Sequence, residues 1–241
     1  MSFESMNQNG MNQYYDNTWQ AQESLGEYTA KTYMWMFLGL LLTFGIGFSG
    51  YATGAVLYAF QSPWAIPVLT GVELITVLVL SWKINTLSVG MARFLFLFYS
   101  ALNGIVFSIY FLMFGVADMM FIFAATALFF GTMAIAAKVF NIDVSGLRPL
   151  MIGGLILLVI FGIASMFIHL GAFEVILCYA GIIIFLLFTA YDTRKVSALY
   201  QYYSRDPEML AKSSIISALQ LYLDFVNLFL YILRLMNSRR N

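Results

Sequence analysis

Long apolar segments are the feature that most restricts the fold of this chain. Seven of them reach the roughly 20 residues of helix that cross a bilayer core of about 30 Å: they are 32–54, 64–83, 93–114, 118–137, 149–169, 173–193 and 213–234. Only 10% of the 241 residues are charged and 61% are hydrophobic, whereas an average soluble domain has about 25% charged residues. The sequence therefore predicts an all-α integral membrane protein with seven transmembrane helices.

The rest of the chain consists of short connections and two polar ends. Residues 1–31 lack a basic region ahead of an apolar core, so they do not resemble a signal peptide. They contain too few apolar residues to pack and are expected to form a disordered tail. Residues 32–236 are expected to form one transmembrane domain, and residues 237–241 a short C-terminal tail.

Positive charges predict the orientation of the protein in the membrane. The alternate connections 55–62, 115–117 and 170–172 contain no Lys or Arg, whereas the side that holds the N-terminus carries Lys31, Lys83, Arg93, Lys138, Arg148, Arg194, Lys195, Arg205 and Lys212. By the positive-inside rule the N-terminus is cytoplasmic. Seven spans then place Arg239 and Arg240 outside, against the rule, but 213–233 is long enough to cross. The short loops and the Asn/Gln-rich tail suggest a bacterial plasma membrane.

Composition and motifs exclude several functions. The net charge of zero gives no indication of nucleic-acid binding, and a single cysteine and a single histidine exclude CxxC and His-cluster metal sites. The chain has no nucleophile elbow, HExxH motif or phosphate-binding loop. An intramembrane aspartyl protease pairs Tyr-Asp with Gly-x-Gly-Asp; Tyr191-Asp192 matches the first half, but Leu221-Tyr-Leu223 precedes Asp224. We therefore expect neither an enzyme nor a bound cofactor.

A polar stripe runs along the last apolar segment. Its members recur at spacings of three and four, so that a helix gathers them on one face: Ser213, Ser217, Gln220, Asp224, Asn227 and Tyr231. The opposite face consists of Leu, Ile, Val and Phe. A carboxyl group that faced lipid would destabilise the helix by several kcal/mol, so we expect this stripe to face protein or a watery cavity.

Helix geometry brings Asp224 to a second acid, Asp192. With the turn at 204–208, both aspartates lie roughly 20–27 Å from its tip, and antiparallel helices would present the two carboxyl groups to each other. Close carboxyl groups in a poorly solvated place cannot both ionise easily, and they titrate as a pair. The charged pair attracts a cation, whereas a pair that shares a proton can close a path. The alternative is that the aspartates only hold the helices together by hydrogen bonds.

Two further polar residues leave alternatives open. Glu73, near the middle of the second segment, is either an additional ligand or a hydrogen-bonding group between helices. Lys83 either turns toward Asp192 as a counter-ion or extends toward the membrane surface.

The stretches that contain the aspartates resemble the signature sequences of the Bax inhibitor-1 family. They are Phe188-Thr-Ala-Tyr-Asp-Thr193 and Ala218-Leu-Gln-Leu-Tyr-Leu-Asp-Phe-Val-Asn-Leu-Phe229, and the helix around Val72-Glu-Leu-Ile-Thr-Val-Leu-Val-Leu-Ser-Trp82 is similar to the second helix of that family. The resemblance implies a seven-helix bundle whose last helix is surrounded by the other six. It also implies a pH-sensitive calcium leak, with Asp192 and Asp224 as the ion path, the pH sensor and transient calcium ligands.

Two positions depart from the family pattern, and a second function remains open. Arg194 stands where the family often has Gln, and Lys83 is the nearest cation to the place where members carry an arginine; these are the candidate latches on the acidic pair.

The alternative to a channel is a regulator without transport activity that binds a membrane protease or a cell-death protein. Deletion of residues 1–28 should then abolish regulation and leave ion flux intact. A proton-coupled transporter would show an inverted repeat, and none is found.

Overall fold

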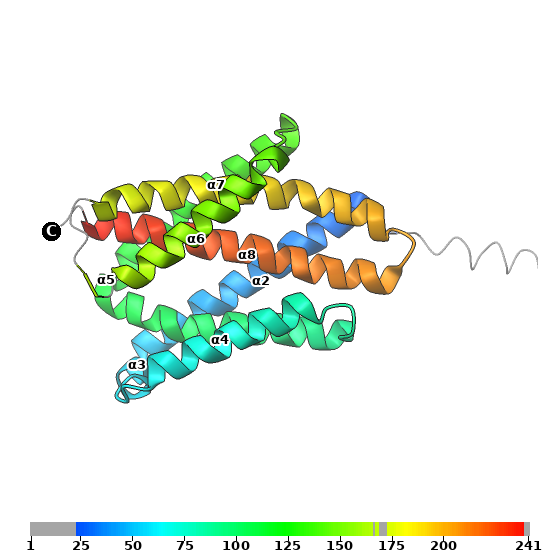
Figure 1. Ribbon diagram of the computed structural model, residues 1–241. Helices are drawn as coiled ribbons and strands as arrows, with labels where there is room; N and C mark the ends of the chain where they lie inside the picture. Colours follow the sequence, from blue (N-terminus) through cyan, green and yellow to red (C-terminus); the bar gives the residue numbers. More distant parts are fainter. Residues whose placement is uncertain (1–22, 166, 169–172, 239–241) are drawn as a thin grey trace, which may run out of the picture.

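The computed structural model describes residues 23–165, 167–168 and 173–238, which form a bundle of helices (Figure 1). The elements in chain order are α2 (Leu25–Ala52), α3 (Ala55–Ala59), α4 (Ala65–Trp82), α5 (Val89–Val139), η1 (Ser145–Leu147), α6 (Arg148–Ala164), α7 (Phe173–Tyr203) and α8 (Pro207–Ser238). Within the described residues, six helices are long and apolar enough to cross a membrane: α2, α4, α5, α6, α7 and α8. The predicted all-α integral membrane fold is confirmed.

Helix α5 contains two of the seven predicted spans. Its 51 residues would measure about 77 Å if straight, more than twice the thickness of a bilayer core. The helix is broken at Gly115, whose backbone angles (φ 76°, ψ 166°) are not helical. In Figure 1 the green helix reaches one end of the molecule and doubles back there. The predicted connection 115–117 is thus a break at a single glycine, and the six long helices provide seven crossings.

Several helices extend beyond the predicted apolar segments. Helix α2 begins at Leu25 rather than at residue 32, because Ser24 and Glu27 form a capping box: the Ser24 Oγ accepts from the Glu27 N–H (3.2 Å) and the Glu27 Oε2 accepts from the Ser24 N–H (2.8 Å). The predicted disordered tail 1–31 is therefore wrong for residues 25–31, which are helical, and its residues 1–22 lie outside the described part of the chain. At the other end, α8 continues to Ser238, into the predicted 237–241 tail.

Helices α7 and α8 form the hairpin that carries both aspartates. Only residues 204–206 separate the two helices. The Asp206 Oδ1 accepts from the Met209 N–H (3.0 Å), and Pro207 occupies the first helical position, where its missing N–H is not needed. The turn falls where the sequence predicted it, and the two helices lie side by side along their length (Figure 1).

Helix α8 occupies the centre of the bundle. In its most apolar stretch 61% of the residues are buried, against 11–33% in the other spans. In Figure 1 it crosses the middle of the molecule, with α7 on one side and α4 on the other. Its buried face therefore contacts protein on most sides, which is the setting that the polar stripe requires.

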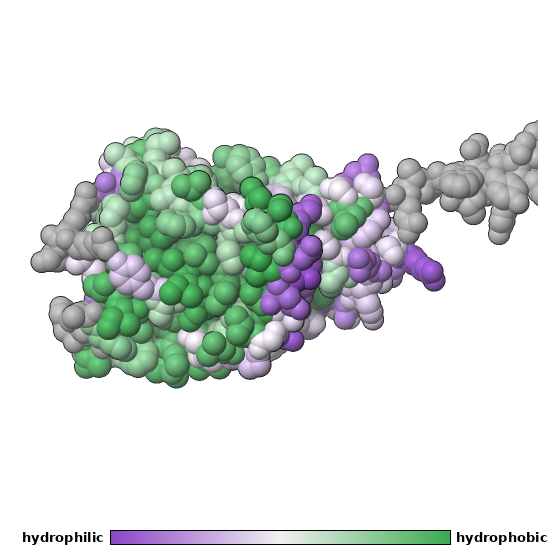
Figure 2. Space-filling view, turned by 90° about the horizontal axis from the view of Figure 1, so that it is seen from above, coloured by the Kyte–Doolittle hydropathy of each residue, from purple (hydrophilic) through white to green (hydrophobic). Residues whose placement is uncertain are grey.

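Polar side chains gather at one end of the molecule. Figure 2 shows hydrophilic residues gathered at the end where α2 begins and a hydrophobic surface over most of the rest of the visible face. The same end holds the α4–α5 connection and the α7–α8 turn (Figure 1). Among the described residues, most Lys and Arg at the ends of helices therefore share one face of the membrane region, whereas Arg234, near the end of α8, lies at the other.

Candidate functional site

The polar stripe of α8 faces the interior of the bundle. Ser213, Ser217 and Asp224 are buried, and Gln220 and Asn227 are half-buried. Three consecutive members of the stripe each have a buried polar atom without a hydrogen-bond partner in the described protein: Ser217 Oγ, Gln220 Oε1 and Asp224 Oδ2. Buried polar atoms normally have partners, so this line of atoms is suited to water or to a cation.

Asp192 on α7 and Asp224 on α8 lie close enough for their charges to act on each other. The side chains are almost completely covered, with 8% and 5% of their surface exposed. Charged groups in such surroundings interact more strongly than they do in water. Two carboxylates here repel each other, and that repulsion is relieved by a proton or by a cation.

Basic groups near the pair lie on α7 and at the start of α6. The charge of Lys195 acts on both aspartates, and the charge of Arg148 acts on Asp192. Neither of the two predicted latches, Arg194 and Lys83, is among these basic groups. Arg194 donates from Nη1 to the backbone oxygen of Asn141 (2.9 Å), and Lys83 is exposed at the end of α4.

Helical spacing explains the difference between Arg194 and Lys195. Residues three apart share a face of a helix, so Lys195 lies on the face of Asp192, whereas Arg194, two residues away, does not. Lys83 is distant because α4 packs chiefly on α5 and α8 lies between α4 and α7 (Figure 1). The three-residue spacing of Asp192 and Lys195 was the available signal in the sequence.

Glu73 approaches α8 beside Tyr222. Its charge acts on the hydroxyl groups of Tyr99 and Tyr110 on α5 and of Tyr222 on α8. Its Oε1 atom is buried and lacks a hydrogen-bond partner in the described protein. Glu73 thus belongs to a second polar site in the same interior, surrounded by phenol groups.

Hydroxyl groups of α2 close the interior at the end where α2 begins. The hydroxyl groups of Tyr28 and Ser213 are 2.9 Å apart, and those of Thr32 and Ser214 are 3.0 Å apart. Farther along α2, Thr43 hydrogen-bonds the hydroxyl of Tyr222 (2.7 Å). Sequence reasoning missed these residues of α2, although they recur at helical spacing on its buried face.

A cavity of about 420 Å³ opens at the other end of α8. Its polar lining includes Tyr110, Glu174, Asn227, Arg234 and Asn237. The Arg234 Nε donates to the Glu174 Oε1 (2.7 Å), and the Arg234 Nη2 donates to the Ser165 Oγ (3.0 Å). Asn227 belongs both to this cavity and to the polar stripe, so the stripe continues into a polar space at this end.

The acidic pair is poor in ligands for a permanently bound metal. No group of three or more His, Cys, Asp or Glu side chains that could hold a metal ion occurs in the described part of the chain. Calcium prefers six to eight oxygen ligands. A calcium ion at Asp192 and Asp224 would need hydroxyl, amide or water oxygens to complete its shell, which suits brief occupancy.

Known proteins similar to this chain include an inner membrane protein and uncharacterized proteins of bacteria. A model of the family described as "Inhibitor of apoptosis-promoting Bax1" matches residues 25–241. The inner membrane protein YbhL of Escherichia coli K12 is 36% identical over 227 residues, which cover 93% of this chain and 97% of YbhL. An uncharacterized protein of Borreliella burgdorferi is 30% identical over 234 residues, and one of Deinococcus radiodurans is 32% identical over 212 residues. These alignments cover 94% and 88% of this chain, and 99% and 90% of the relatives.

Proposed function

The chain belongs to the Bax inhibitor-1 family of membrane proteins, and from this premise we propose that it is a pH-sensitive calcium leak channel. Calcium is the permeant ion and protons are the regulator, so the function needs no catalytic residue and no bound cofactor. The observation that carries the proposal is the buried Asp224 Oδ2, which lacks a protein partner and lies beside Asp192 in the interior of a membrane bundle.

The aspartate pair attracts a cation when both carboxyl groups are ionised and closes the ion path when they share a proton. When both carboxyl groups are ionised, they attract a divalent cation that relieves their mutual repulsion. When they share a proton, a hydrogen bond can join α7 to α8 and the attraction for calcium falls. Lower pH therefore closes the path and higher pH opens it. Lys195, which lies three residues from Asp192, moderates the negative charge of the open state.

The polar stripe supplies the route. From the cavity at Asn227 an ion would pass Asp224, then Gln220, then Ser217. The hydrogen bonds between Tyr28 and Ser213 and between Thr32 and Ser214 lie across the far end of this line. Conduction requires those hydrogen bonds to break, so we assign the gate to this end of the polar stripe.

We propose a bacterial plasma membrane location with a cytoplasmic N-terminus. The basic residues at the end where α2 begins favour that side as the cytoplasm, and YbhL is an inner membrane protein. Calcium would then enter through the cavity lined by Arg234 and leave past Tyr28. Any interaction with a membrane protease or another membrane protein would be additional to this activity.

The test is calcium flux into liposomes that contain the purified full-length protein, measured between pH 5 and pH 8. We expect the wild type to conduct more at pH 8 than at pH 5. Asp224→Asn and Asp192→Asn should lower the flux at pH 8 about tenfold, because loss of one charge from the pair weakens cation attraction by about 1.4 kcal/mol or more. Both variants should also lose most of the pH dependence.

Asp143→Asn is the matched control. Asp143 is an exposed loop acid whose pKa is lowered by hydrogen bonds from Ser145, so it stays ionised across the tested range. Its replacement should leave both flux and pH dependence unchanged. Absence of flux in the wild type at every pH, or wild-type behaviour in both aspartate variants, would overturn the proposal. A flux-free protein would favour the regulatory alternative.

A further inference from the structure

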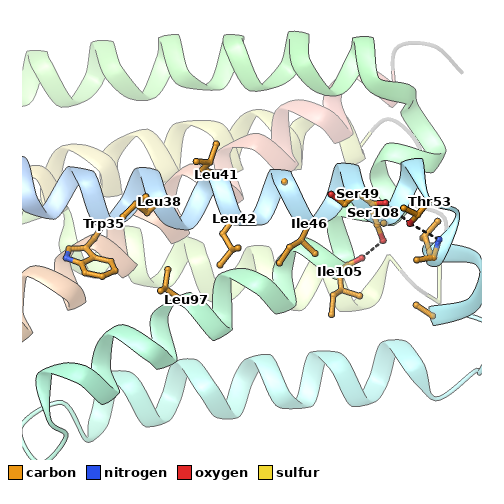
Figure 3. Close-up of a pocket in the computed structure, with 15 residues that line it drawn as sticks. Trp35, Leu38, Leu41, Leu42, Ile46, Ser49, Thr53, Leu97, Ile105 and Ser108 are labelled. Carbon is orange, nitrogen blue, oxygen red and sulfur yellow. Dashed lines mark hydrogen bonds between the residues drawn. The ribbon is translucent and has the colours of Figure 1, made fainter.

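A long apolar groove lies on the lipid-facing side of the bundle, away from the polar stripe. Its cavity of about 940 Å³ lies between α2, α3 and α5, and it is at the upper end of the range for ligand sites in proteins. Figure 3 shows Leu42 and Ile46 of α2 pointing toward α5, which carries Leu97. Leu38 of α2 and Ile105 of α5 also line the groove. From Trp35 to Thr53 the groove follows α2 for about 27 Å, most of the thickness of a bilayer core.

The interior of the groove offers little to a polar ligand. The Thr53 hydroxyl donates to the backbone oxygen of Ser49, and the Ser108 hydroxyl donates to that of Ile105 (Figure 3). These hydroxyl groups are therefore satisfied by their own helices. The remaining lining is mostly aliphatic, so the groove is suited to a hydrocarbon chain.

Gly45 makes the groove deep. A Cβ atom added there would meet nothing within 4 Å, although Gly45 lines the cavity. Other glycines of α2 are used for helix packing: a Cβ at Gly47 would lie 3.0 Å from Phe107, and one at Gly50 would lie 2.9 Å from Ser108. Close packing therefore explains Gly47 and Gly50, whereas the space at Gly45 remains open to the bilayer.

A cation lies at one mouth of the groove. Arg93 is one helical turn from Leu97, and its guanidinium carbon is 5.5 Å from the centre of the Trp35 ring. Arg93 is exposed, and it forms no ion pair with any residue that the structure describes. Stacking on Trp35 holds the guanidinium group in place while its N–H groups stay available. Such a group is well suited to a phosphate.

We propose that the groove binds an anionic phospholipid from the leaflet on the side where α2 begins. One acyl chain lies between α2 and α5, in the space left by Gly45, and the phosphate lies against Arg93. Trp35 separates the two parts of the lipid and lies at the depth where tryptophan is common in membrane proteins. The binding site is independent of the acidic pair.

The first test is native mass spectrometry of the full-length protein in detergent, titrated with phosphatidylglycerol or with phosphatidylcholine of the same chains. We expect one phosphatidylglycerol to be retained about tenfold more strongly than phosphatidylcholine, because an arginine–phosphate pair without a neighbouring choline cation is the stronger one. Arg93→Gln should remove this preference, and Arg93→Lys should keep part of it.

Gly45→Leu tests the chain-binding part of the site. Its side chain would fill the groove without meeting any neighbour near the Cβ, so folding should be preserved while retention of phosphatidylglycerol falls about tenfold. Gly153→Leu is the matched control, because Gly153 is an exposed helical glycine of α6 with nothing within 4 Å of its Cβ position. This control should bind lipid like the wild type.

A second measurement reports whether the bound lipid lies beside Trp35. In a protein whose only tryptophan is Trp35, phosphatidylglycerol with brominated chains should quench fluorescence at lower mole fractions than brominated phosphatidylcholine. The difference should vanish in Arg93→Gln. Three results would overturn the proposal and indicate unselective contact with bulk lipid. They are equal retention of both lipids by the wild type, a preference that persists in Arg93→Gln, and unchanged retention of phosphatidylglycerol in Gly45→Leu.

Discussion

At the scale of single residues, the position of a polar atom on its helix decides its role. Lys195 reaches the acidic pair and Arg194 does not, although they are adjacent in the sequence. Asp224 and its stripe were predictable from the sequence, because their spacing alone defines one face of a helix. The residues of other helices that meet this face were not, since sequence spacing does not reveal which helices become neighbours.

Thr43 provides a residue-scale prediction. Its hydroxyl joins three elements, through Tyr222 on α8 (2.7 Å), the Ser100 carbonyl on α5 (2.9 Å) and the Gly39 carbonyl on α2 (3.0 Å). Thr43→Val removes these bonds and deprives a fully buried tyrosine hydroxyl of a partner. We expect a loss of about 1–2 kcal/mol of stability, measured by thermal or denaturant unfolding in detergent.

Thr132→Val is the control for Thr43→Val. The Thr132 hydroxyl bonds only carbonyl groups of its own helix and is exposed. This variant should unfold like the wild type. An equal loss in both variants would show that the Thr43 hydroxyl does not join the helices.

At the scale of elements, hydropathy located the spans, and local backbone chemistry set their ends. The capping box at Ser24 lengthens α2 beyond its apolar stretch, and Asp206 with Pro207 begins α8 ahead of the predicted residue 213. Both signals are present in the sequence, but the apolar criterion does not include them. The break within α5 was predicted as a connection of three residues. A single glycine is enough to break the helix because Gly115 adopts backbone angles that are not helical.

Gly115 provides the element-scale prediction. Its φ of 76° and ψ of 166° lie in a region that is essentially confined to glycine. Gly115→Ala should therefore reduce stability by about 1–3 kcal/mol, even though its Cβ would meet nothing within 4 Å. Unfolding in detergent measures the effect.

Gly131→Ala is the matched control in the same helix. Gly131 also has open space around its Cβ position but lies within regular helix. Alanine should stabilise this position by about 0.5–1 kcal/mol. A Gly115→Ala variant at least as stable as the wild type would show that the backbone at Gly115 is not strained by a side chain.

At the scale of the whole molecule, charge and hydropathy together define two ends and a lipid-facing girdle. Figure 2 shows the polar end and the hydrophobic surface beside it. The sequence predicted this layout because charged residues occur almost only near the ends of the spans. It also predicted, through the family resemblance, that α8 would be central. The groove beside α2 was not predictable, since it depends on how far α2, α3 and α5 stand apart.

Orientation gives the whole-molecule prediction. In a Cys178→Ser background, Gln61→Cys and Ser145→Cys place single thiols in the exposed α3–α4 and α5–α6 connections, on opposite sides of the predicted membrane spans. With a cytoplasmic N-terminus, a membrane-impermeant maleimide should label residue 61 in intact cells. It should label residue 145 only in inverted vesicles. The reverse pattern would place the N-terminus outside.

The central position of α8 also has a consequence for biosynthesis. This helix leaves the ribosome after the other described spans, yet its buried face supplies much of the surface on which those helices rest. The earlier spans must therefore remain in the bilayer in a looser arrangement until α8 arrives. Final assembly then depends on translation through α8, and a chain cut short before Pro207 would leave six crossings around an unfilled centre.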